Sequence, residues 1–364
     1  MTRSATFVLE PLPDIDTLEK LWRGFDRGGA HSFFLTWTWI GTLLRTTTKP
    51  PLLVKVLRGS ELAGLALLTQ RQGWLHKLLP IRQAWLNATG HADLDGVTIE
   101  HNGFALPSGN DTALWPAFVS WFAQERFADE LIVPGIDPEE AHGGRKGLYV
   151  LERRKDGFRT PLGALGEGGI ASLISSNARQ QLRRSLRDYG DGLVLDRAHD
   201  SETALSYFAG LKELHAKSWT RRGRRHAFDG PFFETFHRAL IAAGMDDDSV
   251  DLLRVRAGER AIGYLYNFRR NGVVSSYQSG FDDEAPGLRP GYVCHALAMA
   301  HYARMGESTY DFLAGTNRLK QSFGTEKYEL CWRHYRQPTL GFRAEHLARK
   351  AVRIIRRRPH GKGS

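Results

Sequence analysis

Alternating apolar and polar residues predict a series of strands in the second half of the chain. They are expected at about 250–257, 261–270, 273–281, 309–314, 328–336 and 339–343. The apolar positions of 292–305 instead follow helical spacing, with Pro290 just before them and Gly306 just after them. This order places a helix N-terminus, which favours anions, directly after a strand that can bind an extended ligand.

Helical spacing also predicts three helices that precede these strands. Their expected ranges are about 174–189, 204–219 and 232–243. In the first of them, Arg179, Arg183 and Arg187 stand one turn apart and give the helix a basic face.

A weak internal repeat connects the two halves of the chain. The segment VKVLRGSELAGLALLTQRQG at 54–73 resembles LRVRAGERAIGYLYNFRRNG at 253–272. Each segment predicts a hairpin, with its turn at Gly59 or Gly258. Two copies of one α/β unit explain the similarity.

Length and glycine content suggest where the two units divide. The chain has 364 residues, 41% of them hydrophobic and 25% charged, which is enough for two domains with cores. Glycine accumulates and periodicity disappears at 157–170. We therefore expect domains at 1–165 and 166–345, followed by a basic tail at 346–364.

The formal net charge of +10 is concentrated in the predicted helix at 174–189 and in the tail. Such surfaces attract nucleic acid, anionic lipid or a polyanionic ligand, or are simply solvated, and charge alone does not choose among these. In the tail, Leu347, Ala351, Ile354 and Ile355 fall on one side of an amphipathic helix. That helix either packs on the protein, the commoner case, or rests on an anionic membrane surface.

Several classes of protein are disfavoured by the sequence. It lacks a secretory signal pattern, a long apolar run and a cysteine framework, which predicts a cytoplasmic protein. It also lacks the GxxxxGK[ST], GxSxG, HExxH and CxxC motifs and a recognisable nucleic-acid-binding motif. We therefore expect no metal site.

The loop PGLRPGYV precedes the predicted helix at 292–305 and could bind phosphate. Gly291 lets the backbone approach an anion closely, and Arg289 can add a charge-assisted contact. In the preceding strand, Ser275, Tyr277 and Ser279 are expected on one face, and a bulge is expected at Gly280. A strand that splays at such a bulge offers unpaired backbone groups to an extended ligand.

Asp311 is the strongest candidate for chemistry, because it lies in the otherwise apolar strand STYDFLAG. A buried carboxylate there either pairs with an arginine or works at a site. Lys320 follows nine residues later and could orient a carbonyl or stabilise negative charge. Trp219 and Arg222 end the second predicted helix and are candidates for substrate binding, although tryptophan in such a place is more often part of a core.

Five segments occur in a recognisable order: NARQQLRRSLRDYG, SWTRRG, FHRAL, YQSGFDDEAPG and YDFLAG followed by a lysine. With them, the chain from about Gly169 to Arg343 resembles the GNAT-superfamily acyltransferases associated with bacterial cellulose biosynthesis. That group is similar in turn to the tandem-domain Fem-type peptidyltransferases. The sequence departs from the family pattern at Arg289, where serine is usual, and at 317–319, where an acidic residue and a tyrosine are missing.

The resemblance implies an α/β (α+β) fold of two tandem GNAT-like domains, each a mixed, mostly antiparallel sheet flanked by helices, with the first domain degenerate. It implies an N- or O-acyltransferase that uses acetyl-CoA or another acyl-CoA and no metal. The acceptor would be a sugar, glycan or amine linked to polysaccharide synthesis.

The same resemblance implies roles for individual residues. Arg289, Gly291 and Tyr292 would hold the pyrophosphate, and Ser279 and Gly280 the pantetheine. Asp311 and Lys320 would lie at the acceptor end. Our own hypothesis is that Asp311 acts as the base, directly or through a water, that strand amides and Lys320 polarise the thioester carbonyl, and that Tyr277 or Ser279 protonates the thiolate. Two alternatives stay open: a Fem-like transferase that uses aminoacyl-tRNA, and a non-catalytic scaffold that contacts the inner membrane through its basic tail.

Overall fold

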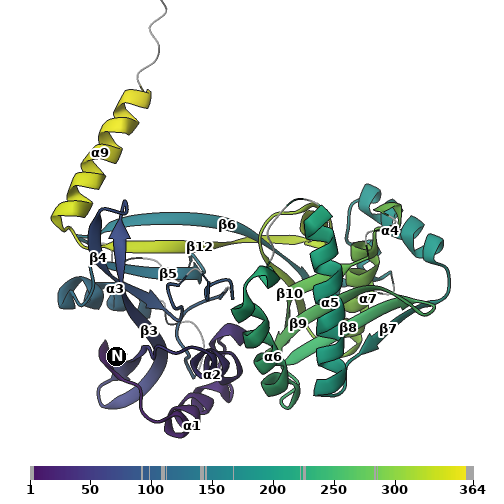
Figure 1. Ribbon diagram of the computed structural model, residues 1–364, viewed down its shortest axis with the longest axis horizontal. Coiled ribbons are helices and arrows are strands. Elements are labelled where there is room, and N and C mark those ends of the chain that lie inside the picture. Colours follow the sequence, from purple (N-terminus) through teal and green to yellow (C-terminus); the bar gives the residue numbers. More distant parts are fainter. Residues whose placement is uncertain are drawn as a thin grey trace, which may run out of the picture.

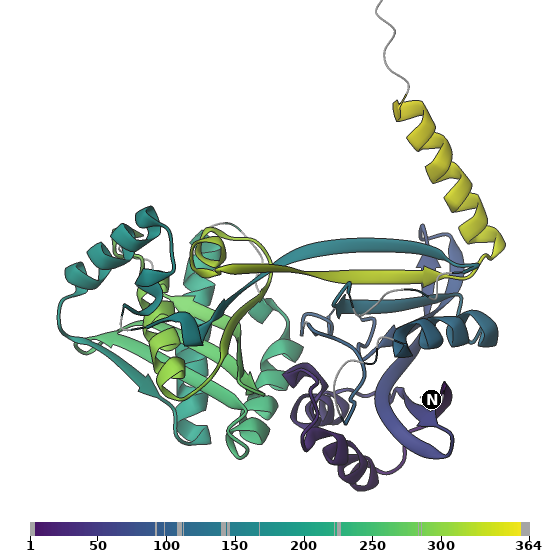
Figure 2. The ribbon, with the colours of Figure 1, turned by 180° about the vertical axis from the view of Figure 1, so that it is seen from behind.

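The structure is a computed structural model that describes residues 4–91, 93–97, 99–107, 111, 113–139, 143, 146–166, 168–221, 223, 227–282, 284 and 286–357. The strands in these residues form one sheet of 12 strands (Figure 1). Their order across the sheet is β1-β2-β3-β4-β5-β12-β6-β11-β10-β9-β8-β7. Most neighbouring strands run antiparallel, and helices flank the sheet (Figures 1 and 2), as the predicted fold class requires.

Two segments of the chain repeat the same order of elements: strand, two helices, three strands, helix and strand. The first unit comprises β1 (Ala5–Pro11), α1 (Ile15–Asp26), α2 (Trp37–Thr46), β2 (Leu52–Arg58), β3 (Glu61–Leu75), β4 (Leu79–Leu86), α3 (Leu114–Glu125) and β5 (Glu130–Ile136). The second comprises β7 (Leu193–Arg197), α5 (Ser201–Arg221), α6 (Pro231–Met245), β8 (Val250–Ala257), β9 (Arg260–Arg270), β10 (Val273–Phe281), α7 (Pro290–Arg304) and β11 (Thr309–Ala314).

The predicted hairpins are present in both units, and they match in detail. Gly59 and Gly258 occupy the turns with positive φ angles of 68° and 60°, which glycine adopts without strain. The ladder shifts register directly after Val56 in one hairpin and directly after Val255 in the other. The last two strands of each unit, β4 with β5 and β10 with β11, pair in parallel. The internal repeat is therefore structural.

Two long strands join the units (Figures 1 and 2). β6 (Tyr149–Pro161) pairs with β11 of the second unit, and β12 (Glu326–Arg336) lies between β6 and β5 of the first. Residues 157–161, expected in a break between domains, thus belong to a strand. The division at residue 165 stays a prediction: β12 follows this position in the sequence, but it pairs with β5 and β6, which both precede it.

Aromatic side chains fill the interface between the units. Phe33, from a short 3₁₀ turn before α2, stacks on Phe268 of β9 with ring centroids 4.3 Å apart. Trp39 of α2 meets Phe236 of α6 edge to face at 5.0 Å. These side chains share one core cluster, so the interface is packed as a domain interior is.

The helices predicted at about 174–189, 204–219, 232–243 and 292–305 are confirmed as α4 (Ser176–Tyr189), α5, α6 and α7. The strand predicted at 339–343 is wrong, because α9 (Leu340–Arg357) begins there. In its first turn, Phe342 is buried against Leu75 and Ile81. A helix can make this contact with a single side chain. The expected packing of the tail on the protein extends only to Glu345 and His346, which contact Arg336 and Tyr149, and residues 347–350 are exposed.

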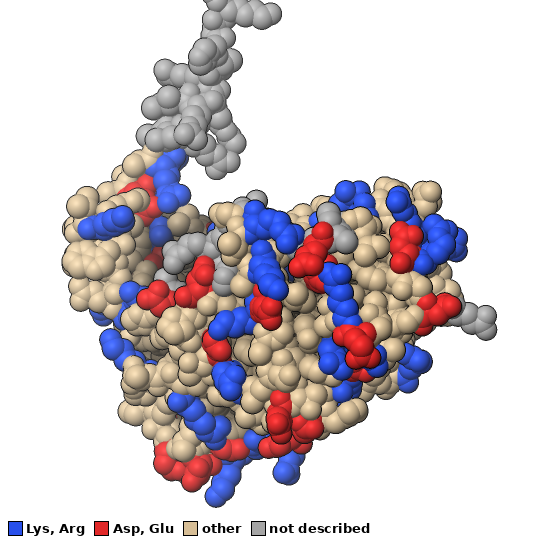
Figure 3. Space-filling view, turned by 45° about the vertical axis from the view of Figure 1, so that its right-hand side comes forward, with Lys and Arg blue, Asp and Glu red and all other residues tan. Residues whose placement is uncertain are grey.

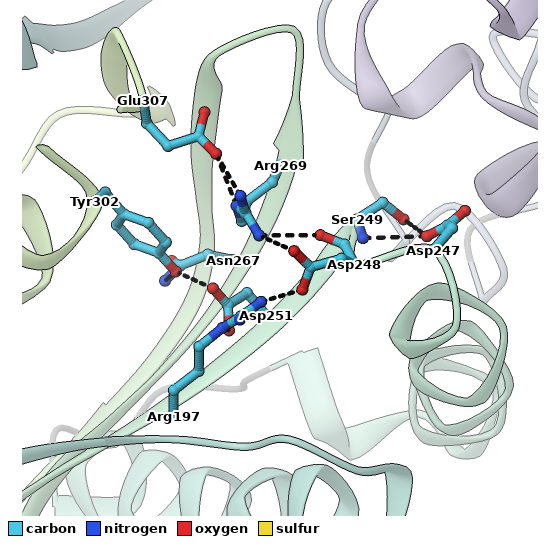
Figure 4. A network of polar contacts seen from close by, with 9 residues as sticks. All are labelled: Arg197, Asp247, Asp248, Ser249, Asp251, Asn267, Arg269, Tyr302 and Glu307. Atoms are coloured by element: carbon cyan, nitrogen blue, oxygen red, sulfur yellow. Dashed lines mark hydrogen bonds and ion pairs between the residues drawn. The ribbon is translucent and has the colours of Figure 1, made fainter. Parts of the chain in front are cut away.

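A buried polar network fixes the outer strands of the second unit (Figure 4). Asp251 on β8 is fully buried; it accepts hydrogen bonds from Arg197 Nε at 2.9 Å and from the Tyr302 hydroxyl at 3.0 Å. Arg269 on β9 bonds Asp248 and Glu307 nearby. These contacts tie β7, β8, β9 and α7 together, since a buried carboxylate is stable only when its oxygens are satisfied.

We predict that Asp251→Asn lowers the free energy of unfolding by about 3 kcal/mol, because it leaves the Arg197 charge without its buried partner. Urea denaturation of the purified protein measures this. Glu213→Gln, which breaks an exposed pair with Lys217 in α5, serves as the control and should leave the denaturation midpoint unchanged. Equal midpoints for all three proteins would show that the network contributes nothing to stability.

Candidate active site

The parallel strands β10 and β11 form a fork. They pair only at Val273–Ser275 with Thr309–Asp311, and no further pairs follow among the described residues. β10 has a bulge at Tyr277, and β11 is irregular between Asp311 and Ala314, where Leu313 adopts a left-handed φ of 61°. That φ is strained for leucine and marks a backbone held by its surroundings. Beyond the last pair, the facing edges of both strands lack a ladder partner.

The bulge lies at Tyr277 and not at Gly280, where the sequence placed it. Gly280 pairs with Tyr264, and a Cβ there would lie 2.4 Å from the carbonyl oxygen of Leu211 on α5. Glycine is thus needed for the close approach of α5. The bulge also breaks the alternation of side chains along β10. Gly280 faces α5, so its neighbour Ser279 points to the opposite face of the sheet. The expected single face of Ser275, Tyr277 and Ser279 is therefore not formed.

Asp311 lies at the base of the fork, and three donors satisfy it. Its side chain is 5% exposed. Oδ1 accepts from the Tyr328 hydroxyl at 2.7 Å and from the Leu313 amide at 2.8 Å, and Oδ2 contacts His101 Nε2 at 3.0 Å. Asp311 belongs to the second unit, Tyr328 to β12 and His101 to the first unit, so the cluster is built from three distant parts of the chain.

Glycine allows Tyr328 to reach Asp311. Gly157 on β6 lies opposite Tyr328 in the β6–β12 ladder, and a Cβ there would lie 2.3 Å from the ring carbon Cζ. The ring therefore lies across β6 toward β11, which only glycine at position 157 permits. Burial and the charge of Asp311 raise the pKa of Tyr328, which keeps the hydroxyl protonated as a donor.

The protonation pattern of His101 follows from its partner. The ionised carboxylate of Asp311 can only accept hydrogen bonds, so its contact between Oδ2 and His101 Nε2 requires a hydrogen on Nε2. We therefore assign the hydrogen of the neutral imidazole ring to Nε2. Nδ1 then holds a lone pair, and it has no hydrogen-bond partner among the described residues. Burial alone would lower the pKa of His101, but the hydrogen bond and charge of Asp311, together with Glu100, outweigh it and raise the pKa.

A cavity of about 320 Å³ opens between the two units in front of this cluster. Its aromatic and polar walls come from both units and from β6, and they include Phe33, His101, Trp115, Arg159, Ser275 and Asp311. Since Ser275 and Asp311 form the last pair of the fork, the cavity ends where β10 and β11 diverge.

Two further charged side chains, the buried Glu100 and the half-buried Lys320, lie at the far end of β11. Glu100 Oε2 accepts from the Ala314 amide at 2.6 Å, and burial raises the pKa of Glu100. Lys320, on the short helix α8 (Arg318–Phe323), donates from Nζ to the carbonyl oxygens of Leu313 and Ala314 at 3.2 and 2.8 Å; burial lowers its pKa. Lys320 thus lies beside the irregular turn of β11 and contacts its backbone, rather than Asp311.

The predicted phosphate loop leads into α7 with a left-handed residue. Arg289 has a φ of 46° and its guanidinium lies 5.6 Å from the centroid of the Tyr292 ring. Gly291 is closely packed, since a Cβ there would lie 3.0 Å from the Leu319 side chain and 3.2 Å from the Phe281 ring. Tyr292 is buried and bonds Ser322, so its side chain belongs to the core. The first turn of α7 has no side-chain cap among the described residues.

Of the two remaining candidates, Trp219 is not among the described residues that line the cavity. Trp219 is half-buried on α5, with its ring 5.3 Å from that of His215. Arg222 lies outside the described residues.

Three residues of the site, Glu100, His101 and Tyr328, were not predicted from the sequence. The one local signal was the polar run His101-Asn102-Gly103 after an apolar segment, typical of a turn that carries functional side chains.

The comparisons with known proteins agree with this geometry. The family described as acetyltransferase (GNAT) domain matches residues 176–321, which include the fork, α7 and Asp311. The chain contains a GNAT-type acetyltransferase domain. It is therefore a transferase, and the GNAT fold implies an acyl-CoA co-substrate. No curated protein sequence matches the chain significantly.

Solved structures show the same fold over nearly the whole chain. A crystal structure of FemX is 13% identical, covers 93% of this chain and 99% of its own, and has a TM-score of 0.58. The structure of L-PGS from Bacillus licheniformis is also 13% identical, with 93% and 97% coverage and a TM-score of 0.53. The expected GNAT-like tandem fold is confirmed, and membership of the cellulose-associated group is not. Among the described residues, no cluster of His, Cys, Asp or Glu could hold a metal ion.

We predict that Asp311→Asn lowers the pKa of His101. In the native protein the pKa of His101 is raised above its ordinary value of 6.5. Protonation of the ring therefore stabilises the fold, and this stabilisation is fully present at a pH below 6.5. This contribution is lost as the pH rises through the folded-state pKa. Titration of the imidazole signals by NMR, with His101→Gln to assign the resonance, measures the shift. An identical His101 titration in Asp311→Asn would contradict the pairing.

Proposed function

We propose that the protein transfers an acyl group from a CoA thioester, held at the fork of β10 and β11, to an amine or hydroxyl acceptor in the inter-unit cavity. The observation that carries this proposal is the Ser275–Asp311 pair, which is both the base of the fork and part of the cavity wall. A thioester at the fork and an acceptor in the cavity would meet there.

The donor side rests on α7 and β10. The uncapped first turn of α7 offers N–H groups and a positive dipole end to the pyrophosphate, and the Arg289 guanidinium lies close to this turn. The free edge of β10, along Ser279 and Gly280, would hydrogen-bond the pantetheine as a further strand does. An amide of this edge, near the bulge at Tyr277, would bind the thioester oxygen as it becomes negative. Lys320, beside the turn of β11, could add positive charge.

On the acceptor side we assign the base to His101, with Asp311 as its positioning residue. As the acceptor nitrogen or oxygen attacks the carbonyl carbon, Nδ1 takes the acceptor proton and the C–S bond breaks. Asp311 holds the ring through Nε2 and stabilises the imidazolium that forms. The thiolate then takes a proton from Tyr277 or from water. This assignment replaces direct action of Asp311, whose oxygens are all engaged by donors.

The cavity supports a small acceptor. Its volume is near the lower end of the range for ligand sites, roughly 300–1,000 Å³. Aromatic walls from Phe33 and Trp115, next to polar groups such as Arg159, suit a sugar or a small amine. A link to cellulose or other polysaccharide rests on the sequence resemblance only.

We predict that His101→Gln and Asp311→Asn lower kcat for acyl transfer by about 100-fold or more, the usual worth of general base catalysis. The assay is thiol release from acetyl-CoA with a panel of amines and amino sugars, and CoA binding is followed by thermal shift. His199→Gln, at an exposed position away from the cavity, is the matched control. Both site variants should keep the CoA-induced shift.

Different results separate the parts of this proposal. If native protein shows no stabilisation by any CoA thioester, the assigned donor is wrong. If His101→Gln turns over normally while CoA binds, the donor stands and His101 is not the base.

A Fem-like transferase that uses aminoacyl-tRNA is the second candidate, favoured by the fold shared with FemX and by the net charge of +10. On the face shown in Figure 3, however, basic side chains are interspersed with acidic ones. Many are paired, as Arg254 and Arg256 are with Asp196. A paired surface releases few counterions on binding a polyanion.

We therefore expect this face to bind tRNA weakly, with an affinity that changes little between low and physiological salt. Filter binding of bulk tRNA at several salt concentrations tests this. Tight binding with a steep salt dependence, and no saturable binding of acyl-CoA, would favour the aminoacyl-tRNA donor.

A further inference from the structure

Exposed large apolar side chains gather at one end of the molecule. Among the described residues, those with more than half of their surface exposed all lie on the β3–β4 hairpin tip or on α9. They are Leu340 (85%), Leu78 (79%), Leu347 (65%), Trp74 (58%) and Leu79 (52%). Contiguous exposed apolar surface of this kind marks an interaction site in a soluble domain. We call residues 74–79 and 340–350 the apical surface.

The hairpin tip and α9 are joined firmly. Phe342 in the first turn of α9 is buried on Leu75 and Ile81. A Cβ at Gly341 would lie 3.2 Å from the Leu75 side chain, so the helix backbone sits directly on the hairpin. Glu345 ties the base of the helix by accepting from Arg336 at 2.8 Å. The two parts of the apical surface thus keep a fixed relation to each other.

Beyond this base, α9 extends away from the rest of the molecule (Figures 1 and 2). His346 still stacks on Tyr149 of β6, with ring centroids 4.3 Å apart, and residues 347–350 are exposed. Leu340 and Leu347 are two turns apart and therefore lie on one face. A helix without tertiary packing is only marginally stable in water, and its apolar face gains free energy when a partner covers it.

The charge of the apical surface indicates which partner fits. From position 343 to 364 the sequence has eight Lys and Arg residues and one acidic residue, Glu345. Glu345 is itself engaged by Arg336 and Arg349. Lys77 adds a further exposed cation at the hairpin tip. A second copy of this chain would bring the same positive charge and be repelled, whereas an anionic surface would be attracted.

We propose that the apical surface binds the surface of an anionic lipid bilayer. Leucines on one face of a basic helix enter the boundary between headgroups and acyl chains, and lysines and arginines meet the anionic headgroups. Trp74 at the hairpin tip suits the same boundary, where tryptophan is enriched. No helix in the described part of the chain is long and apolar enough to cross a bilayer, and this mode of contact needs none.

This inference does not depend on the proposed function, because none of the apical residues lines the inter-unit cavity. Lipid binding and acyl transfer can therefore be measured and lost separately.

We predict that the native protein co-sediments with vesicles of phosphatidylcholine and phosphatidylglycerol, binds phosphatidylcholine vesicles far more weakly, and is released by high salt. Two double variants, Trp74→Ala with Leu78→Ser and Leu340→Ser with Leu347→Ser, should each weaken binding by about tenfold or more. The control is Val194→Ser with Met305→Ser, which removes exposed apolar side chains elsewhere. Thermal melts confirm that each variant is folded.

Equal vesicle binding by the apical variants and the control would overturn the proposal, as would binding without preference for phosphatidylglycerol. Sedimentation velocity without lipid gives a further test. If the native protein self-associates and the apical variants do not, the surface is an interface between copies of the chain and the lipid assignment is wrong.

Discussion

The insertion of β12 between β5 and β6 is the constraint on which the rest of the structure depends. Its hydrogen bonds turn two units with the same order of elements into one continuous sheet. The same ladder sets Tyr328 opposite Gly157, so that the phenol reaches across β6 to Asp311. A slip of one residue would move the Tyr328 ring to the other face of the sheet and leave a buried carboxylate short of a donor. The register of the sheet is therefore also what places the Tyr328 hydroxyl at Asp311.

Local sequence patterns were sufficient to predict most strands and helices of the second unit. The strands β8, β9, β10 and β11 follow from period-two alternation and glycine turns, and α7 follows from the proline and glycine that bracket it. Asp311 could be singled out because a carboxylate in an apolar strand must be compensated. The bulge was misplaced at Gly280 because glycine there serves the approach of α5, a tertiary contact that leaves no separate mark in the sequence.

The remaining features are products of long-range contacts. His101 and Asp311 are 210 positions apart, and the polar turn at 101–103 does not by itself indicate which of its residues will face the second unit. Residues 157–161 had the composition of a connection, yet they lie in β6, since Gly157 leaves room for an aromatic ring from β12. The misassigned strand at 339–343 has the same origin. Phe342 of this segment packs on the distant hairpin of β3 and β4 from the first turn of a helix, not from a further strand.

The shared cluster of His101, Asp311 and Tyr328 also bears on how the protein is made. During synthesis the first unit emerges with His101 but without its partner, and the second unit then supplies Asp311. Neither stage includes β12, so until it is added β5 and β6 face each other across a gap with unpaired edges. The cluster gains its third member only when one of the last strands enters the sheet. A nascent chain on the ribosome can thus complete most of its secondary structure long before this cluster is assembled.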